Sequence, residues 1–256
     1  MGAVVGTPPE RAVVQFAIDG ELQSVEPLGR GHIHRTWCSR FRGPAGERRF
    51  VHQRINRAVF EQPDRVMDNI ARVTGHLRRK FREAGSDPTR RTLTIVPARD
   101  GSPLLRTIDG EYWRTYRYID HASTFDAPRD EAHVFQVGQA FATFLRMLAD
   151  LEGPPLYETI RRFGDTRLRF ERFVDVTNRD PLGRAGAVAD EIAFVRRRER
   201  LAALVVELIA AGAVPRRVAH HDTKINNVLI DDATDEGICV IDLDTVMAGT
   251  VLYDFG

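Results

Sequence analysis

Residues 220–227 read HHDTKINN, and residues 240–244 read VIDLD. The first stretch places an aspartate, Asp222, two residues after His220, and an asparagine, Asn227, five residues beyond that aspartate. The second stretch ends an apolar strand in Asp242, fifteen residues after Asn227. Carboxylate and amide oxygens are the hard ligands that Mg²⁺ prefers. The two stretches therefore predict a cleft with Asp222 in a loop between two short strands and Asp242 at the end of the next one.

The spacing in the first stretch is that of a kinase catalytic loop, H-x-D-x-x-x-x-N. We assign Asp222 as the base that accepts the proton of an attacking hydroxyl, and Asn227 with Asp242 as magnesium ligands. Lys224, one of only two lysines against 35 arginines, is placed to offset the charge of the transferred phosphoryl group, and His220 to brace the loop. Asp and Asn in turns also cap backbone N–H groups, but the whole set in one loop favours the catalytic interpretation.

The bulk composition excludes several classes of protein. The 256 residues carry a formal net charge of +1, with 43% hydrophobic and 29% charged residues, which argues against a dedicated nucleic-acid binder. Two separated cysteines, Cys38 and Cys239, indicate neither a disulfide framework nor a zinc site. No secretory signal or membrane-spanning run is evident, so we expect a cytoplasmic protein that binds no membrane; its oligomeric state stays open.

The first 120 residues predict a sheet of about five strands with one long helix over residues 63–85. Gly29 and Gly31 lie in a turn between two strands, where glycines let backbone N–H groups approach phosphates, although an ordinary hairpin turn explains them equally well. Arg54, in a strand over residues 49–55, is the candidate cation for the nucleotide phosphates. Asp68 or Glu83 is its candidate partner, and the sequence does not choose between them.

The second part is mainly helical. Apolar residues recur at helical spacing over 129–151, 165–178 and 187–211, and short strands are predicted at 217–219, 228–230 and 238–241. We therefore expect an α+β fold with a β-rich domain over residues 1–120, a hinge at 120–123, and a helical domain over residues 121–256 that carries the catalytic loop.

At residues 220–227 and 240–247 the chain resembles the aminoglycoside phosphotransferase-like kinases, and within them most closely the N-acetylhexosamine 1-kinases. Supporting segments are QRIN (53–56), MDNI (67–70), Trp113-Arg114 and YDFG (253–256). The resemblance runs from about residue 25 to the end, and it implies a bilobal, protein-kinase-like fold. It implies ATP and Mg²⁺ as cofactors and transfer of the γ-phosphate to a sugar, at the anomeric hydroxyl of an N-acetylhexosamine.

The resemblance also implies roles for further residues. The backbone of Tyr118, Ile119 and Asp120 would hold adenine, and Asp244 would support the metal site or contact the sugar. The alternatives are another alcohol acceptor (an amino alcohol, a homoserine-like compound or an aminoglycoside) and an inactive, truncated nucleotide-binding module. The family continues with further helices beyond the position of Gly256, so the resemblance implies an incomplete C-terminal lobe.

The closing residues Asp254-Phe255-Gly256 spell the metal motif of protein kinases. Asp254 lies 27 residues after Asn227, however, and Asp242 lies 15 after it, directly behind an apolar strand. We therefore predict that Asp254 is a structural carboxylate and that Asp242 binds the metal.

Overall fold

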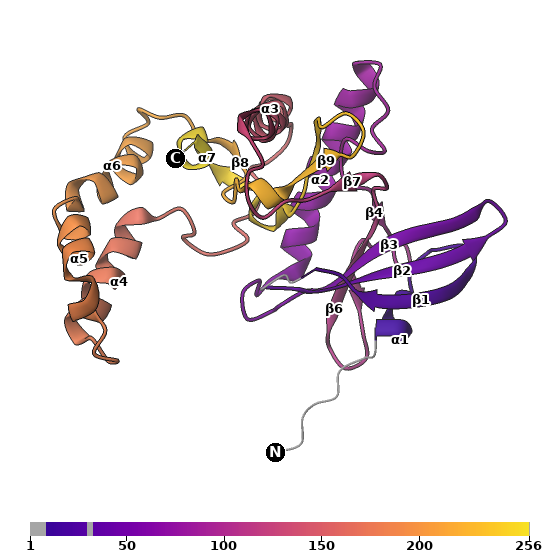
Figure 1. The fold of residues 1–256 in the computed structure, drawn as a ribbon, viewed down its shortest axis with the longest axis horizontal. Helices are drawn as coiled ribbons and strands as arrows, with labels where there is room; N and C mark the ends of the chain where they lie inside the picture. Colours follow the sequence, from indigo (N-terminus) through magenta and orange to yellow (C-terminus); the bar gives the residue numbers. More distant parts are fainter. Residues whose placement is uncertain (1–8, 30–32, 256) are drawn as a thin grey trace.

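The computed structural model describes residues 9–29 and 33–255. Its amino-terminal part is a six-stranded antiparallel sheet preceded by a short helix (Figure 1). The strands lie in the order β1-β2-β3-β6-β4, with β5 beside β6. The elements are α1 (Pro9–Val13), β1 (Glu21–Pro27), β2 (Arg35–Gly43), β3 (Gly46–Arg54), β4 (Ile95–Val96), β5 (Leu105–Arg106) and β6 (Tyr112–Arg117).

The two faces of this sheet have different surroundings, because successive side chains along a strand point to opposite faces. On β3, Phe50 and His52 face a small core that also contains Trp113, which is fully buried. Val51 and Gln53 lie on the other face, where they line a cavity described below. The side chains of β3 thus pack into a core on one face of the sheet and line a cavity on the other.

Two long helices form the centre of the molecule, α2 (Pro63–Glu83) and α3 (Glu131–Met147). Pro63 opens α2 at a position where the missing N–H costs nothing, and the predicted stripe through Val66, Ile70 and Val73 is buried. The Asp130 side chain caps α3 by accepting a hydrogen bond from the His133 N–H at 2.7 Å. Both helices contribute to the larger core.

Short strands and turns against these helices carry the catalytic-loop residues. They are β7 (Ala122–Ser123), β8 (Arg217–Ala219), β9 (Val228–Asp231), β10 (Gly237–Val240), β11 (Met247–Gly249), the 3₁₀ turns η2 (Ile225–Asn227) and η3 (Leu243–Thr245), and the helix α7 (Val251–Phe255). The strands pair as β10-β9-β7 and as β11-β8. Gly237 lets β10 approach α3 closely, because a Cβ there would lie 2.6 Å from the Gln136 carbonyl oxygen.

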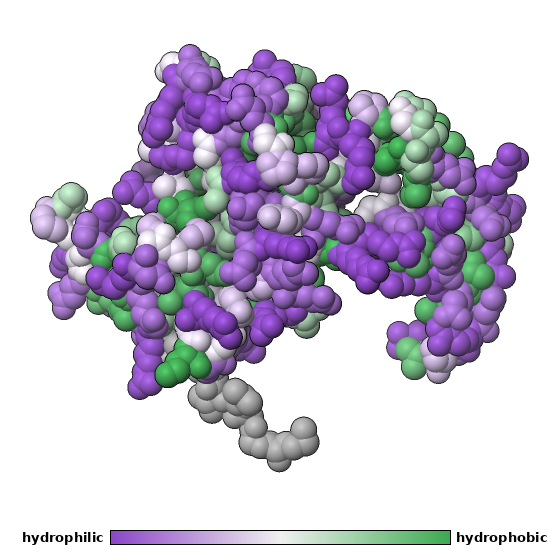
Figure 2. Space-filling model, turned by 180° about the vertical axis from the view of Figure 1, so that it is seen from behind, coloured by the Kyte–Doolittle hydropathy of each residue, from purple (hydrophilic) through white to green (hydrophobic). Residues whose placement is uncertain are grey.

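A helical arm projects from this body between α3 and β8 (Figures 1 and 2). It contains α4 (Thr166–Arg179), η1 (Ala185–Val188), α5 (Ala189–Arg196) and α6 (Glu199–Ala210), none of which has a buried residue. The single helix predicted over residues 187–211 is wrong. Arg197 and Arg198 interrupt it, with Arg198 leaving helical geometry (φ −108°, ψ 18°), so the two helices α5 and α6 take its place.

No helix within residues 9–29 and 33–255 is both long enough and apolar enough to cross a membrane.

Candidate active site

The catalytic loop follows β8 and is held from inside by His220, which is fully buried. The His220 Nε2–H donates to the Ile241 carbonyl oxygen at 3.1 Å, and its Nδ1 accepts from the Asp222 N–H at 3.3 Å. Phe141 packs edge-on against the ring at 5.2 Å. Burial lowers the pKa of His220, so the ring stays neutral and acts as a brace between β10 and the loop.

Asp254 holds the same loop from the other side. Its carboxylate oxygens accept hydrogen bonds from the N–H groups of His220 and His221, each at 2.7 Å. The Thr223 hydroxyl donates to the Asp254 carbonyl oxygen at 2.9 Å. These contacts confirm that Asp254 is a structural carboxylate.

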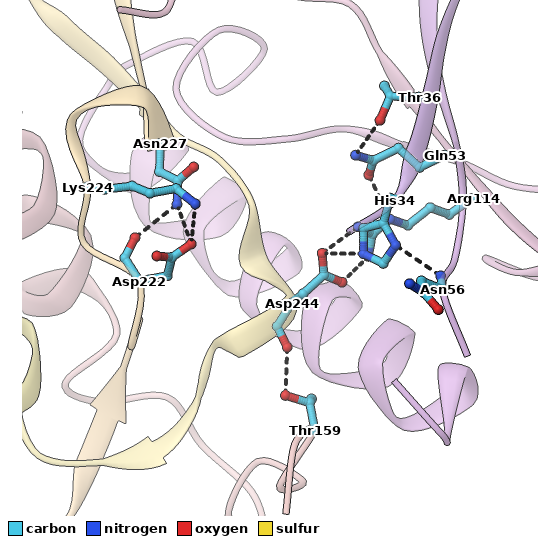
Figure 3. Close-up of polar contacts among 10 residues, drawn as sticks. All are labelled: His34, Thr36, Gln53, Asn56, Arg114, Thr159, Asp222, Lys224, Asn227 and Asp244. Atoms are coloured by element: carbon cyan, nitrogen blue, oxygen red, sulfur yellow. Dashed lines mark hydrogen bonds and ion pairs between the residues drawn. The ribbon is translucent and has the colours of Figure 1, made fainter. Parts of the chain in front are cut away.

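Three predicted residues meet at the surface of the loop (Figure 3). The Asn227 amide Nδ2 donates to the carbonyl oxygen and to the Oδ2 of Asp222, at 2.9 and 3.0 Å. The Lys224 ammonium lies 2.7 Å from the same Oδ2, and the Asp222 side chain is 34% exposed. Because Asn227 uses its nitrogen on Asp222, its Oδ1 remains available as a ligand for a cation.

Asp242 follows β10 in a left-handed conformation (φ 57°), which turns the chain sharply at that point. Burial and the neighbouring Asp244 carboxylate raise the pKa of Asp242 to about 7. Within the described chain, no N–H group donates to the Asp242 side chain. A desolvated carboxylate that receives no N–H donor, lining the same cavity as a free amide oxygen, fits a Mg²⁺ ion.

No group of three or more His, Cys, Asp and Glu side chains in the described ranges is arranged to hold a metal ion. A magnesium ion at Asn227 and Asp242 would therefore have two protein ligands and complete its shell with water and phosphate oxygens, as Mg²⁺ commonly does.

Asn227 and Asp242 open into a cavity of about 510 Å³ between the sheet and β9-β10. The predicted residues Gly29, Tyr118 and Ile119 also line it. Its walls are formed by Leu28, Thr36, Val51, Gln53, Leu93, Arg114, Tyr116, Arg117, Ala122, Ser123, Thr124, Leu229, Ile241 and Leu243. Apolar side chains from both sides, together with polar groups, suit a flat heterocycle that carries a charged tail.

Comparison with known proteins assigns the family. A model of the phosphotransferase enzyme family matches residues 24–256. The chain belongs to this family. The phosphotransferase shares its fold with a spectinomycin phosphotransferase solved with ADP and spectinomycin, at a TM-score of 0.60 and 15% identity over 96% of this chain and 70% of that one.

Two further solved structures are similar. An aminoglycoside phosphotransferase from Alicyclobacillus acidocaldarius matches at a TM-score of 0.58 and 16% identity, over 98% of this chain and 70% of that one. Plasmodium vivax ethanolamine kinase matches at a TM-score of 0.50 and 12% identity, over 96% of this chain and 61% of that one. These similarities confirm the predicted α+β, kinase-like fold of the phosphotransferase.

The prediction for Arg54 needs correction. Arg54 is absent from the lining of the cavity and forms an ion pair with Glu111, not with Asp68 or Glu83. The reason is strand alternation: Gln53 faces the cavity, so its neighbour points away.

The remaining predicted nucleotide contacts are Asp120, Gly31, Tyr118 and Ile119. Asp120 lies outside the cavity lining, and its Oδ1 accepts a hydrogen bond from the Arg49 Nε–H at 2.9 Å. Gly31 lies outside the described residues. The Tyr118 N–H donates to the Arg49 carbonyl oxygen at 3.1 Å, whereas the Ile119 N–H has no partner in the described part of the chain. Ile119 therefore offers the free donor of this segment.

The phosphotransferase also contains a buried ion pair that sequence reasoning missed (Figure 3). Arg114, from β6, forms a bidentate pair with Asp244, with the Nη2–Oδ2 distance at 2.6 Å and side-chain exposures of 1% and 3%. The Arg114 Nε–H donates to Gln53 Oε1 at 2.9 Å. The sequence analysis singled out Trp113-Arg114 and Asp244 separately, but nothing in the sequence showed that the two side chains meet.

Other groups complete the surroundings of Asp244. His34 Nε2–H donates to its Oδ2 at 3.1 Å, and the Thr159 hydroxyl donates to its carbonyl oxygen at 2.6 Å. The Arg114 guanidinium and the His34 donor hold the pKa of Asp244 far below its usual range. Protein donors thus engage both carboxylate oxygens of Asp244, and its contact with a sugar or support of the metal site stays a prediction.

Proposed function

We propose that this phosphotransferase transfers the γ-phosphate of ATP to a hydroxyl group of a small molecule, with Asp222 as the base. The observation that carries the proposal is the direct contact of Asp222, Lys224 and Asn227 at the edge of the cavity that Asp242 also lines. Phosphoryl transfer depends mainly on positioning and charge stabilisation, and these groups are of the types that it needs.

The contacts of Asp222 suggest which atom takes the proton. Its Oδ2 is occupied by Asn227 and Lys224, whereas its Oδ1 has no hydrogen bond within the described residues. Oδ1 therefore accepts the proton of the acceptor hydroxyl as the oxygen attacks. The Lys224 ammonium, 50% exposed, is free to turn toward the transferred phosphoryl group and offset its charge.

Asn227 Oδ1 and the Asp242 carboxylate would hold magnesium, which when bound neutralises charge on the phosphates. The adenine would lie in the apolar part of the cavity, between Val51 on the sheet side and Leu229 and Ile241 on the other. The free Ile119 N–H would donate to a ring nitrogen.

For the acceptor we propose a sugar, phosphorylated at the anomeric hydroxyl of an N-acetylhexosamine. The support is the resemblance of residues 220–227 and 240–247 to kinases of that group. The arm over residues 166–210, which lies beside the catalytic loop in sequence, has nine arginines against seven acidic residues. That balance disfavours a polycationic acceptor such as an aminoglycoside.

ADP formation from ATP and Mg²⁺ tests the proposal, measured with N-acetylglucosamine, N-acetylgalactosamine, ethanolamine, homoserine and an aminoglycoside. We expect N-acetylhexosamines to stimulate turnover, and phosphorus–proton coupling to place the phosphate on C1. Asp222→Asn should reduce kcat by about 10²–10⁴-fold, the usual contribution of a general base, while nucleotide binding persists.

Asp235→Asn is the matched control, because Asp235 is exposed, pairs with Arg129, and has a positive φ that asparagine tolerates. Full turnover in Asp222→Asn would show that the base is another group. If no acceptor stimulated ADP formation although ATP raised the melting temperature, the chain would be a binding module and the proposed transfer would be wrong.

A further inference from the structure

A second cavity, of about 340 Å³, lies on the sheet face opposite Val51 and Gln53. Three arginines from separate elements line it: Arg48 from β3, Arg78 from α2, and Arg117 at the end of β6. Thr89 and Thr94 add hydroxyl groups, and Ile18, Ile95 and Pro97 form an apolar part. Three arginine residues thus line one hollow outside the catalytic loop, and the exposed Arg117 also lines the 510 Å³ cavity.

None of these three arginines forms an ion pair with any residue that the structure describes, although many other arginines of the chain do. The Arg48 Nη2 donates only to the Asp19 carbonyl oxygen at 2.8 Å, and its buried Nε–H has no partner. The Arg78 Nη1 donates to the Thr94 hydroxyl at 2.6 Å. Their positive charges are therefore left uncompensated by direct contacts.

Asp87 offsets part of this charge, although it forms no ion pair with the three arginines in the part of the chain that the structure describes. Asp19 lines the cavity without pairing with its arginines, and the Asp87 carboxylate is occupied by the N–H and hydroxyl of Thr89. Burial, with the charges of Arg82 and Arg117, lowers the pKa of Arg78. Like charges are thus crowded together, and a bound anion would relieve their repulsion.

We propose that this cavity is a binding site for a phosphate group, either free or carried by a small phosphomonoester. A phosphoryl dianion presents several acceptor oxygens, which match the forked N–H donors of arginine. The Thr94 hydroxyl accepts from Arg78 and so has its own proton free to donate to a phosphate oxygen. The volume and the apolar lining leave room for a small organic group beside the phosphate.

The site lies apart from Asp222, Asn227 and Asp242, but it shares Arg117 with the proposed nucleotide cavity. It joins α2 to the sheet, and α2 also holds the segment after Asp244, because the Asn69 amide donates to the Val246 carbonyl oxygen at 3.1 Å. A ligand that contacts Arg78 would therefore bind an element that also supports the active site.

Titration of ¹⁵N-labelled protein with inorganic phosphate, and separately with glycerol phosphate, tests the proposal at ionic strength held constant with chloride. We expect saturable shifts of the Thr89 and Thr94 amides and of the arginine Nε–H signals. Tighter binding of glycerol phosphate would identify an organic phosphate as the ligand, and tighter binding of inorganic phosphate would identify the free ion.

Arg78→Gln and Arg48→Gln should each weaken binding by about tenfold or more, the loss expected for one charge-assisted hydrogen bond. Arg79→Gln, on the same helix but paired with Glu83, should leave it unchanged. Melting temperatures identify any variant that fails to fold. If Arg78→Gln fails, Arg78→Lys replaces it, because lysine keeps the positive charge and lacks the forked N–H donors of the guanidinium. Shifts that do not saturate and that chloride reproduces, or equal binding in all folded variants, would overturn the proposal.

Discussion

Replacing Arg114 with methionine should destabilise the phosphotransferase by about 3–5 kcal/mol, because it leaves the buried Asp244 carboxylate without its cation. The magnitude follows from the contacts: Arg114 makes two charge-assisted hydrogen bonds to Asp244, and both side chains are at most 3% exposed. Such bonds contribute about 1.5–3 kcal/mol each, and a typical domain has only about 5–15 kcal/mol in total. The variant should therefore unfold at much lower urea concentration.

The double variant Arg114→Met/Asp244→Asn measures the interaction free energy between the two side chains, apart from the effect of each single substitution. Once the carboxylate is neutral, the loss of Arg114 no longer strands a charge, so the double variant should cost less than the sum of the single variants, by about 2 kcal/mol. Urea unfolding followed by tryptophan fluorescence measures this difference. Trp37 and Trp113 stack at 4.9 Å in the same sheet and report on its integrity.

The pH dependence provides a second measurement. The pKa of Asp244 is lowered, so the carboxylate contributes its stability above the pKa of the unfolded chain, about 4, and loses it as the pH falls through the lower folded value. Asp244 itself should therefore contribute equally at pH 5 and pH 8, and a change of the coupling near pH 7 would report the titration of the neighbouring Asp242.

Arg54→Met is the matched control, because the Arg54–Glu111 pair of the same sheet is 26% and 19% exposed and should contribute about 1 kcal/mol or less. The reasoning would be refuted if Arg114→Met lowered the free energy of unfolding by less than Arg54→Met does. It would also be refuted if the losses of the two single variants added up to that of the double variant.

Three further predictions concern single groups. Burial lowers the pKa of His52 to about 3, below its value in the unfolded chain. The free energy of unfolding should therefore decrease as the pH drops below about 6.5, by about 2 kcal/mol from pH 7 to pH 5. Urea unfolding of His52→Gln should lack this pH dependence. Gly249→Ala would place a Cβ 2.4 Å from His221 Nε2, beside Asp222, and should lower kcat about tenfold in the ADP assay while Ala248→Gly does not. Because the pKa of Asp242 is about 7, calorimetry should find Mg²⁺-dependent ADP binding weakening about tenfold per pH unit below 7 and constant above pH 8.

The parts of the fold that rest on local signals were predicted well. Alternation and glycine turns identified β1 to β3, and the apolar stripe with Pro63 identified α2. The strands β7 and β11 were missed, since each has two or three residues and a partner far along the chain, as with Ala122 opposite Asp231. Elements this short show little periodicity of their own, although β8, which is equally short, was predicted at residues 217–219.

The same distinction applies to the candidate site. Asp222, Lys224 and Asn227 meet because six residues of one loop contain them all, and the spacing alone indicates their contact. The Arg114–Asp244 pair joins positions 130 residues apart, so no local pattern encodes it. The error at Arg54 was a shift of one residue in a strand, which is enough to turn a side chain from the cleft to the opposite face.

Arg114 and Asp244 also explain why Asp242 suits a metal. Two aspartates stand two residues apart, and their surroundings move their pKa values in opposite directions. The guanidinium keeps Asp244 ionised permanently, and that fixed negative charge raises the pKa of Asp242, which has no cation of its own in direct contact. A divalent ion then relieves both the desolvation of Asp242 and its repulsion by Asp244. The buried pair thus prepares a site in which the neighbouring carboxylate is most stable when a cation is bound.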